Sequence, residues 1–275
     1  MSDISFLQAR SLLFAPASDE RKLAKALASA ADALVADLED AVAPGEKARA
    51  REVVLELRPA IVRVNGAGTP WFDDDVALAA KLELDALMLP KATPDAVAAL
   101  GPEGPPVIAI VETARGLQLT AETAAYERVV ALMLGAADLG AEVGLEPRAD
   151  GLELLYPRAK VVFDSAAAGI RPPFDVVHLA IDDAEGLEES ARFARSLGFG
   201  GKACIHPAQI DTVNRVFAPD PEDVTWATRV IAAFDEAQAE GRGATALDGS
   251  MIDLPVVERA RRILGRKEKG ATHDG

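Results

Sequence analysis

Short apolar segments alternate with longer amphipathic stretches along the chain. Eight of the short segments are almost continuously hydrophobic, which is typical of parallel strands buried on both faces. They span residues 11–16, 33–38, 60–65, 86–91, 107–112, 129–134, 176–181 and 203–207. The stretches between them carry helical patterns. This alternation predicts an α/β fold built on a parallel sheet.

Three of the helical stretches have a recognisable start. Ser18 precedes one as a predicted N-cap, Pro44 opens another, and Thr93 with Pro94 opens a third. Serine and threonine are preferred at N-caps, and proline is preferred at the first helical position. A longer helical segment, residues 152–169, is interpreted as an insertion between the sixth and seventh strands.

The number of strand-helix units predicts a TIM barrel. Eight such units occupy about 250 residues, and the chain has 275. A doubly wound open sheet is the structural alternative, but the turn FAPASDE after the first segment lacks the glycine-rich dinucleotide fingerprint of that fold. We therefore predict an α/β fold, a TIM (β/α)8 barrel with a C-terminal helical extension.

The predicted barrel comprises residues 1–217, and residues 218–265 form the C-terminal extension. Within the extension, residues 222–241 have the pattern of a long amphipathic helix. The segment GRGATALDGSMID is interpreted as an extended loop that contains glycine, and PVVERARRILG as a short final helix. The last ten residues, 266–275, are predicted to be a disordered tail.

Composition and charge exclude several classes of protein. Hydrophobic residues make up 49% of the chain and charged residues 27%, so a core can form and wholesale disorder is excluded. The net charge of 29 − 44 = −15 disfavours binding to nucleic acid or to an anionic membrane surface. The single cysteine, Cys204, cannot form an internal disulfide, and the start MSDISFLQARS does not resemble a signal peptide. With no apolar run near the roughly 18 residues of a membrane span, we expect a cytoplasmic protein.

Ionisable residues gather where the predicted strands end. These residues are Asp37, Glu39, Asp40, Arg63, Lys91, Glu112, Asp138, Asp182, Asp183 and His206. The carboxyl ends of the strands form the active-site face of a TIM barrel, and charges there are costly unless they are paired or bind a metal. Carboxylates together with one arginine and one lysine predict a hard cation held by oxygen ligands, with the basic groups facing an anionic substrate.

Several of these residues also have a simpler structural interpretation. Glu112 and Asp138 could cap the helices that follow them. Arg63 could have the purely structural role of neutralising the carboxylates of the DLED segment. His206 is more typical of a hydrogen-bonded residue at the barrel rim, and the three histidines lack the spacing of a zinc site. Cys204 lies in a buried segment, where an inert core thiol is expected. The sequence contains no nucleophile elbow, P-loop or CxxC motif.

Several segments together resemble a known family. They are VADLEDAVAPGEKARAR, IVRVNGAGT, ALMLPKA, IAIVETARG, LMLGAADLG, GKACIHPAQI and ALDGSMIDLPVVERA, in this order from about residue 10 to residue 264. The chain is similar to the citrate lyase β-subunit-like proteins, which group with the malyl-CoA and citramalyl-CoA lyases in the HpcH/HpaI aldolase superfamily. The resemblance implies a TIM barrel in a homotrimer or trimer-based assembly, which uses Mg²⁺ to cleave a carbon–carbon bond in a 3-hydroxyacyl thioester.

The resemblance also implies which residues surround the metal. Glu112 of VETARG and Asp138 of GAADL match the metal ligands. Asp37, Glu39 and Asp40 of the DLED segment match a carboxylate cluster near the waters of the metal. A metal-bound water held by this cluster is one candidate for the base that removes the hydroxyl proton.

Substrate contacts are implied in the same way. Arg63 matches an arginine that contacts the substrate oxyanion or carboxylate, and Asp253 matches an aspartate on a C-terminal lid that reaches into the neighbouring subunit's site. The expected catalytic residues are Arg63, Asp253 and Asp37, and the expected substrate-binding residues are Arg63, Lys91, Glu112, Gly135, Ala136 and Ala137. Because CoA is a polyanion, a local basic patch is also required, for which the first candidates are Lys91, Arg115 and the lysines and arginines near the helix that follows the DLED segment.

Two positions depart from the family pattern and bear on function. Ala137 stands where members commonly have glutamate, and Ala180 where an acidic residue is often found. The expected activity is Mg²⁺-dependent cleavage or formation of citramalyl-CoA, malyl-CoA or citryl-CoA, with acetyl-CoA and a 2-oxo acid as the other partners. One alternative is a citrate lyase β subunit that acts on a citryl thioester of an acyl-carrier subunit within a complex. A further alternative is a non-catalytic homologue that binds a metal and a 2-oxo acid.

Overall fold

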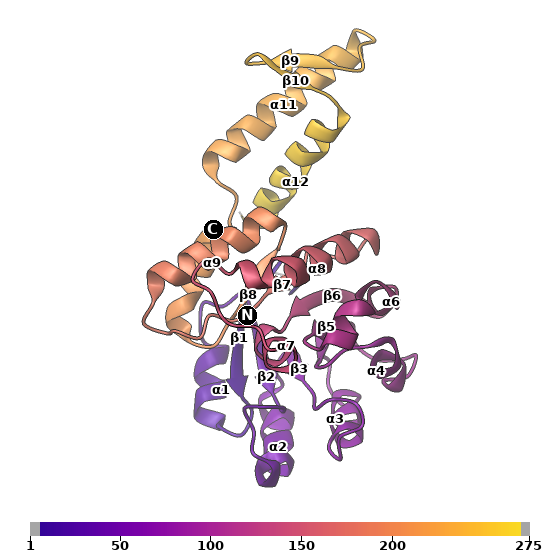
Figure 1. The fold of residues 1–275 in the computed structure, drawn as a ribbon, viewed down its shortest axis with the longest axis vertical. Helices are drawn as coiled ribbons and strands as arrows, with labels where there is room; N and C mark the ends of the chain where they lie inside the picture. Colours follow the sequence, from indigo (N-terminus) through magenta and orange to yellow (C-terminus); the bar gives the residue numbers. More distant parts are fainter. Residues whose placement is uncertain (1–5, 271–275) are drawn as a thin grey trace. The chain divides into compact units, whose positions relative to one another are not determined.

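Eight parallel strands close into a barrel in chain order, and β1 pairs with β8 to complete it (Figure 1). The structure is a computed structural model that describes residues 6–270, with side chains to residue 265. The strands are β1 (Ser11–Pro16), β2 (Ala33–Asp37), β3 (Ile61–Arg63), β4 (Ala86–Leu89), β5 (Val107–Val111), β6 (Val129–Leu134), β7 (Phe174–Asp175) and β8 (Gly201–Cys204). The closed parallel barrel confirms the predicted TIM fold.

Helices follow the strands and lie outside the barrel (Figure 1). They are α1 (Glu20–Leu27), α2 (Lys47–Leu57), α3 (Phe72–Ala79), α4 (Pro94–Ala99), α5 (Ala114–Gln118), α6 (Thr120–Ala124), α7 (Ala136–Val143), α8 (Leu155–Ala167), α9 (Ala184–Leu197) and α10 (Ile210–Phe217). Short 3-10 turns are η1 (Phe6–Gln8), η2 (Pro44–Glu46), η3 (Leu152–Leu154) and η4 (Pro207–Gln209). Within residues 6–270, no helix has both the length and the apolar character needed to cross a bilayer.

The predicted helix starts are partly correct. Thr93 caps α4, because its side chain accepts a hydrogen bond from the Ala96 N–H, and Pro94 follows it at the first helical position. The predicted cap of α1 is wrong by one residue. Asp19 rather than Ser18 is the cap, since its Oδ1 accepts the Lys22 N–H three residues further on, which is the donor a cap must reach.

The seventh strand is shorter and earlier than predicted. It comprises only Phe174–Asp175, and residues 176–181 lie outside the sheet, with Leu179 69% exposed. The prediction followed apolar residues alone and therefore missed a buried ion pair in the barrel wall. Asp175 and Lys202 are both fully buried and lie 2.6 Å apart on neighbouring strands. For the same reason β8 begins two residues earlier than the predicted segment.

The segment predicted as an insertion, residues 152–169, is a regular helix of the barrel. It forms η3 and α8, and α8 packs against β6 and α9 on the way to β7. The additional helix after β6 is α7, which was not distinguished in the sequence. Amphipathic patterns indicate that a helix forms, and only packing against the sheet shows which helix belongs to the outer ring.

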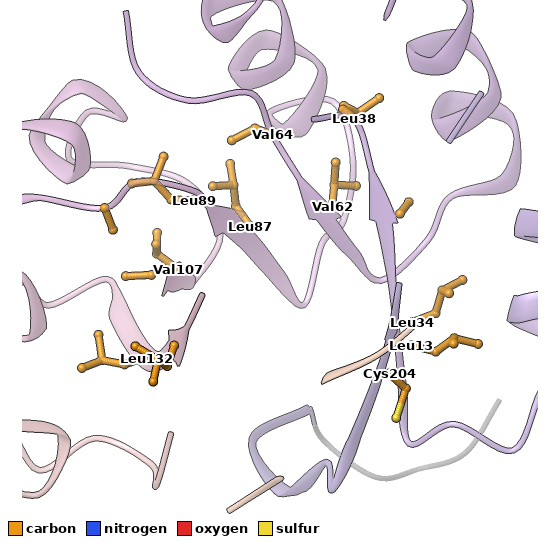
Figure 2. Packing of buried hydrophobic residues seen from close by; sticks show 14 of the residues in the cluster. Leu13, Leu34, Leu38, Val62, Val64, Leu87, Leu89, Val107, Leu132 and Cys204 are labelled. Carbon is orange, nitrogen blue, oxygen red and sulfur yellow. The ribbon is translucent and has the colours of Figure 1, made fainter. Parts of the chain in front are cut away.

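Side chains alternate along the strands between two hydrophobic clusters. Leu12 and Ile108 belong to the cluster inside the barrel, which is built almost only from strands. Their neighbours Leu13 and Val107 belong to the cluster between the strands and the helices (Figure 2). Because both faces of the sheet are buried, the strands are hydrophobic at successive positions.

The chain divides after Phe217 into two compact units, the barrel and a C-terminal unit that starts at Ala218. The C-terminal unit contains α11 (Pro221–Ala239), β9 (Thr245–Leu247), β10 (Ser250–Ile252) and α12 (Leu254–Gly270). It has a small core of its own, formed by Ala227, Val230, Phe234, Ile252, Val257 and Ala260.

The C-terminal unit differs from the prediction at two places. The glycine-containing segment forms an antiparallel hairpin of β9 and β10 rather than a loop. Asp248 and Gly249 in its turn both have positive φ, 51° and 78°, and Asp-Gly is favoured in such two-residue turns. The last helix, α12, is longer than predicted and continues to Gly270, into the segment predicted as a tail. Arginine, lysine and glutamate extend a helix that has already begun, and residues 271–275 lie outside the described part of the chain.

Candidate active site

A pocket of about 440 Å³ lies at the carboxyl ends of the barrel strands, and we call it the active-site pocket. Its charged lining residues are Asp37, Asp40, Arg63, Glu112 and Asp138. Asp37 and Arg63 are the last residues of β2 and β3, Glu112 follows β5, and Asp138 lies in the first turn of α7. The strands of a parallel barrel end at the same face, which is how residues distant in sequence come to line one pocket.

Arg63 and Asp37 form a two-point ion pair in this pocket. Arg63 Nε donates to Asp37 Oδ1 at 2.7 Å, and Arg63 Nη2 donates to Oδ2 at 2.6 Å. The two carboxylate oxygens also accept the backbone N–H groups of Glu39 and Ala41. Burial alone would lower the pKa of Arg63, but the hydrogen bond and charge of Asp37 outweigh it and raise the pKa above its ordinary value. The guanidinium is therefore charged and fixed in direction.

Glu39 connects Arg63 to Lys91. Its Oε1 accepts a hydrogen bond from Lys91 Nζ at 3.0 Å, and its Oε2 lies 3.0 Å from Arg63 Nη1 without accepting a hydrogen bond. Burial raises the pKa of Glu39, and the charges of the two cations offset only part of this effect. Burial alone would lower the pKa of Lys91, but its hydrogen bond with Glu39 and the nearby carboxylates raise it. Carboxylates thus outnumber cations around the pocket.

Glu112 is buried, with 3% of its surface exposed, and the backbone holds it in place. The Lys91 N–H donates to Glu112 Oε1 at 2.8 Å, from a residue with a positive φ of 49°. Oε2 accepts no hydrogen bond from the described residues. Burial and, second to it, the charge of Glu39 raise the pKa of Glu112 to about 7. A Cβ on Gly135 would lie 2.5 Å from Oε2, so only glycine fits there.

Asp138 lies beside the free N-terminal amides of α7. Gly135 is the N-cap, and the N–H groups of Ala136 and Ala137 belong to the first turn, where amides lack acceptors within the helix. The side chain of Asp138 is 41% exposed, and its Oδ1 lies 3.8 Å from Lys91 Nζ. The start of α7 therefore offers a carboxylate and backbone donors that favour a bound anion.

The capping interpretations of the two carboxylates do not match the structure. Thr113 caps α5, because its Oγ1 accepts the Gly116 N–H at 2.9 Å, so Glu112 is not the cap. The cap of α7 is Gly135, three residues before Asp138. Both carboxylates are therefore placed in the pocket without a role in ending or starting a helix.

The simpler interpretations of three other residues do describe their contacts. Arg63 neutralises carboxylates of the DLED segment, as its pairs with Asp37 and Glu39 show. His206 caps η4, and its Nδ1 accepts the Ala208 N–H at 3.2 Å. Cys204 is buried, and burial raises its thiol pKa to about 12. The thiol is therefore protonated and unreactive at neutral pH.

Two predicted residues of the barrel do not line the active-site pocket, and a third belongs to the other compact unit. Asp182 and Asp183 follow the displaced seventh strand, and Asp183 caps α9 by accepting the Gly186 N–H. Asp253 belongs to the C-terminal unit, where its Oδ1 accepts the Val256 N–H at 3.3 Å at the start of α12. The structure of one chain thus groups the barrel residues and leaves Asp253 in a separate unit.

The sequence did not predict the structural role of two residues that shape the site, although Lys47 was among the basic residues near the DLED helix that were considered for binding CoA. Lys47 Nζ donates to the carbonyl oxygens of Leu38 and Glu39, both at 2.7 Å, and so holds the DLED turn. Asn65 Nδ2 donates to the same Leu38 oxygen at 3.0 Å. The prediction considered charged groups at strand ends, and a neutral amide or a lysine on a helix does not stand out by that criterion. The sequence did contain a signal for Asn65, because this polar residue of VRVNG comes two residues after the end of β3.

A second pocket adjoins the active-site pocket, and we call it the β2–β4 pocket. It has a volume of about 640 Å³ and is lined by segments that follow β2, β3 and β4. It shares Asp40 with the active-site pocket, and Lys47, Trp71 and Lys91 line it. The two pockets are therefore neighbours at this face of the barrel.

Glu112 and Asp138 form a donor pair that suits a hard divalent cation. Among residues 6–265, no three or more His, Cys, Asp or Glu side chains are arranged to hold a metal ion. Mg²⁺ needs fewer, because it keeps several waters and binds through one or two carboxylates. The free Oε2 of Glu112 fits such an ion, and so do the burial and the repulsion that raise its pKa, because the ion would compensate the buried negative charge.

Comparison with known proteins gives consistent matches. Residues 10–207 match the family model described as HpcH/HpaI aldolase/citrate lyase. A (3S)-malyl-CoA thioesterase of Cereibacter sphaeroides is 40% identical over 271 residues, covering 94% of each chain. Protein CitE of Mycobacterium tuberculosis, solved with magnesium, acetoacetate and coenzyme A, has a TM-score of 0.82 at 39% identity, covering 95% of this chain and 98% of that one. A citrate lyase beta subunit from M. tuberculosis, solved with oxaloacetate and magnesium, has a TM-score of 0.71 at 39% identity, covering 78% and 100%.

Proposed function

This chain belongs to the HpcH/HpaI aldolase/citrate lyase family, and from this premise we propose that it is a Mg²⁺-dependent carbon–carbon lyase. It splits a 3-hydroxyacyl thioester into acetyl-CoA and a 2-oxo acid, or joins the two. The observation that carries the proposal is one pocket in which Glu112, Asp138 and Arg63 lie together. The magnesium, coenzyme A and oxaloacetate found in the related structures support these ligand classes.

Glu112 and Asp138 are the residues proposed to hold Mg²⁺. Glu112 offers its free Oε2, because the Lys91 N–H occupies Oε1. When bound, the ion supplies Lewis acidity toward the oxygens of the 2-oxo acid. The Lys91 ammonium, near both Glu39 and Asp138, reduces the repulsion among the carboxylates.

Arg63 is the group proposed to stabilise negative charge during cleavage. The hydroxyl oxygen gains negative charge as its proton leaves, and a fixed cation lowers the energy of that state. Asp37 acts through Arg63, because both of its oxygens already accept hydrogen bonds from the guanidinium and the backbone. We therefore assign Asp37 to positioning Arg63. The N–H groups of Ala136 and Ala137 are suited to the substrate carboxylate.

Asp253 is the proposed partner for the acetyl carbon. When the carbon–carbon bond breaks, its electron pair goes to the thioester enolate, whose carbon must then take up a proton. Asp253 uses Oδ1 as a cap, and its Oδ2 accepts no hydrogen bond from the described residues. We propose that the C-terminal unit of a neighbouring copy, in a homotrimer, supplies this carboxyl group.

The thioester arm is assigned to the β2–β4 pocket. This pocket adjoins the active-site pocket at Asp40 and is lined by the Lys91 side chain, which is 45% exposed. Its Trp71 ring offers an apolar surface to the arm. Arg115, the other predicted basic residue, does not line this pocket and lies 3.6 Å from Asp95 at the surface.

The proposal is tested with purified protein, Mg²⁺ and a panel of malyl-CoA, citramalyl-CoA and citryl-CoA. We expect acetyl-CoA and the 2-oxo acid to appear in equal amounts for at least one thioester. Glu112→Gln should lose this activity, because the amide cannot supply a charged ligand. Equal activity of Glu112→Gln and the wild type would overturn the metal assignment.

Two other functions predict different products in the same assay. Hydrolysis, the activity in the name of the C. sphaeroides relative, would release free CoA and a hydroxy acid without acetyl-CoA. A citrate lyase β subunit would turn over only a citryl thioester on an acyl-carrier protein. Binding of a 2-oxo acid with no turnover of any thioester would support the non-catalytic alternative.

A further inference from the structure

A third pocket, of about 960 Å³, borders the active-site pocket on the side of α7, and we call it the α7 pocket. It is enclosed by α7, the segment 145–154, the loop after β7, and α9. Both alanines that depart from the family pattern, Ala137 and Ala180, line it. The proposed chemistry at Glu112 and Asp138 makes no use of this space.

The wall between the two pockets is made of small side chains. Ala136, Ala137 and Val177 line both the active-site pocket and the α7 pocket. Asp138, one of the proposed metal ligands, is the next residue after Ala137. A 2-oxo acid held at the proposed metal site therefore lies beside a low wall with a large pocket behind it.

Resting on the proposed function, we propose that the α7 pocket receives the side chain of the 2-oxo acid, and that the enzyme takes 2-oxo acids with an extended, uncharged, apolar side chain. A 2-oxo acid has one substituent besides its carboxylate and oxo oxygen. The thioester arm is assigned to the β2–β4 pocket, whose lining shares no residue with the α7 pocket. The α7 pocket is then the space that remains for this substituent.

The lining of the α7 pocket favours an apolar group over a second carboxylate. Gly140, Ala141 and Leu145 continue the apolar wall beyond Ala137. The two lining arginines are already engaged: Arg148 pairs with Asp150 at 2.6 Å and Arg158 pairs with Asp175 at 2.9 Å. The further carboxylates of the lining are Glu153, Asp183, Glu185 and Glu189. A dicarboxylate such as oxaloacetate would meet an excess of negative charge here.

The test measures binding of 2-oxo acids by calorimetry to the Mg²⁺-loaded protein, without any thioester. The probes are pyruvate, 2-oxobutanoate, 2-oxopentanoate and oxaloacetate. Each buried methylene should tighten binding about fourfold, which is about 0.8 kcal/mol. The Kd of 2-oxopentanoate should therefore be about 16-fold lower than that of pyruvate, and oxaloacetate should bind more weakly than 2-oxopentanoate.

Gly140 allows the pocket to be filled without disturbing the backbone. A Cβ there would meet only Leu145 Cβ, at 3.8 Å, which is an ordinary contact. Gly140→Leu should reduce the ratio of the pyruvate Kd to the 2-oxopentanoate Kd from about 16 to near 1. Gly140→Ala, the matched control, changes the same helix position but leaves the space open and should keep the wild-type ratio.

The outcomes separate this inference from the proposed function. A ratio near 1 in the wild type, or an unchanged ratio in Gly140→Leu, would overturn the pocket assignment while pyruvate binding still supports the metal site. Tighter binding of oxaloacetate than of 2-oxopentanoate would also overturn it. If none of the 2-oxo acids bound the Mg²⁺-loaded protein, the proposed function would fail and the inference would fail with it.

Discussion

The two hydrogen bonds between Arg63 and Asp37 fix the direction of the guanidinium as well as its charge. Asp37 itself is held by two backbone N–H groups of the following turn, so the pair moves as one piece with that turn. Glu112 is fixed in the same way by a single backbone N–H from Lys91. At the scale of single residues, the site depends on the direction in which these side chains are held. A substitution can change that direction while the charge stays the same.

Arg63→Lys keeps the positive charge but removes the two-point contact, because an ammonium is a single point charge. We expect kcat/KM to fall about 100-fold, equivalent to about 2.7 kcal/mol of transition-state stabilisation. Steady-state turnover of the active thioester measures this. Arg115→Lys is the control, since Arg115 is 71% exposed and lies outside the pocket. Activity of Arg63→Lys within about threefold of the wild type would contradict a role for the two-point contact.

Gly135→Ala should remove metal binding through crowding alone. The new Cβ would lie 2.5 Å from Glu112 Oε2 and 2.6 Å from Glu112 Cβ, so the carboxylate must move. In the wild type, Mg²⁺ at about 100 times its Kd should stabilise the native state by about 2.7 kcal/mol. Thermal unfolding with and without Mg²⁺ measures this gain. Gly135→Ala should lose this gain, and Gly140→Ala, whose Cβ would make only an ordinary contact at 3.8 Å, should keep it. A retained gain in Gly135→Ala would show that Glu112 does not hold the ion.

At the scale of secondary-structure elements, β7 has only two residues that pair with the neighbouring strands. Buried charges also hold it in the barrel. Asp175 accepts hydrogen bonds from Arg158 of α8 at 2.9 Å and from Lys202 of β8 at 2.6 Å. Lys202 also donates to Ser190 of α9 at 3.0 Å. Asp175 and the two cations thus join β7, β8, α8 and α9 in one buried network.

Asp175→Asn would leave two buried cations without a countercharge, which costs about 3–5 kcal/mol. We expect the urea concentration at the midpoint of unfolding to fall by the corresponding amount. The slope of the unfolding free energy against urea concentration should stay unchanged. Asp182→Asn, at an exposed position in the next loop, should stay within about 0.5 kcal/mol of the wild type. Equal stability of the two variants would show that the network does not hold β7.

The same pair predicts a dependence of stability on pH. Burial alone would raise the pKa of Asp175, but the charges of Lys202 and Arg158 lower it below its ordinary value. A depressed pKa in the folded state stabilises the protein above the unfolded pKa of about 4, and the stabilisation is lost as the pH falls below that value. As the pH falls below about 4, the wild type should lose stability more steeply than Asp175→Asn, as measured by urea midpoints at a series of acidic pH values.

At the scale of the whole molecule, the proposed catalytic groups are divided between two compact units. The barrel holds the metal ligands and Arg63, whereas Asp253 belongs to the C-terminal unit. Asparagine is as good an N-cap as aspartate, so Asp253→Asn removes the acid without removing the cap of α12. This makes the proton-transfer role separable from the structural one.

Mixing two inactive variants tests whether active sites are shared between copies. Asp253→Asn and Glu112→Gln should each lose activity. Subunits reassembled from an equal mixture should regain about a quarter of the wild-type activity, because that fraction of sites combines two intact residues from different chains. Each variant reassembled alone is the control. If the two variants are unfolded, mixed and refolded together, and light scattering confirms the mass of a trimer, then no recovery of activity would rule out a shared site.

The sequence by itself determined the fold class and most of the barrel residues of the site. Eight apolar segments with helices between them lead to a parallel barrel, and the ends of such strands meet at one face, so Asp37, Arg63, Glu112 and Asp138 could be grouped in advance. This works because burial on both faces makes the strands hydrophobic and leaves polar residues only where the strands end.

Tertiary structure alone decided which charges are buried and which oxygens are free. Asp175 and Lys202 resemble surface residues in the sequence, yet their mutual contact makes burial tolerable, and β7 ends at Asp175, before the predicted segment. The free oxygen of Glu112 depends on an N–H from Lys91, 21 residues away, and on the absence of a side chain at Gly135. The α7 pocket likewise depends on where α7 and α9 pack. Hydrophobic periodicity in the sequence indicates which residues contact a core. Ion pairs and pockets depend instead on distances between segments that are far apart in the chain.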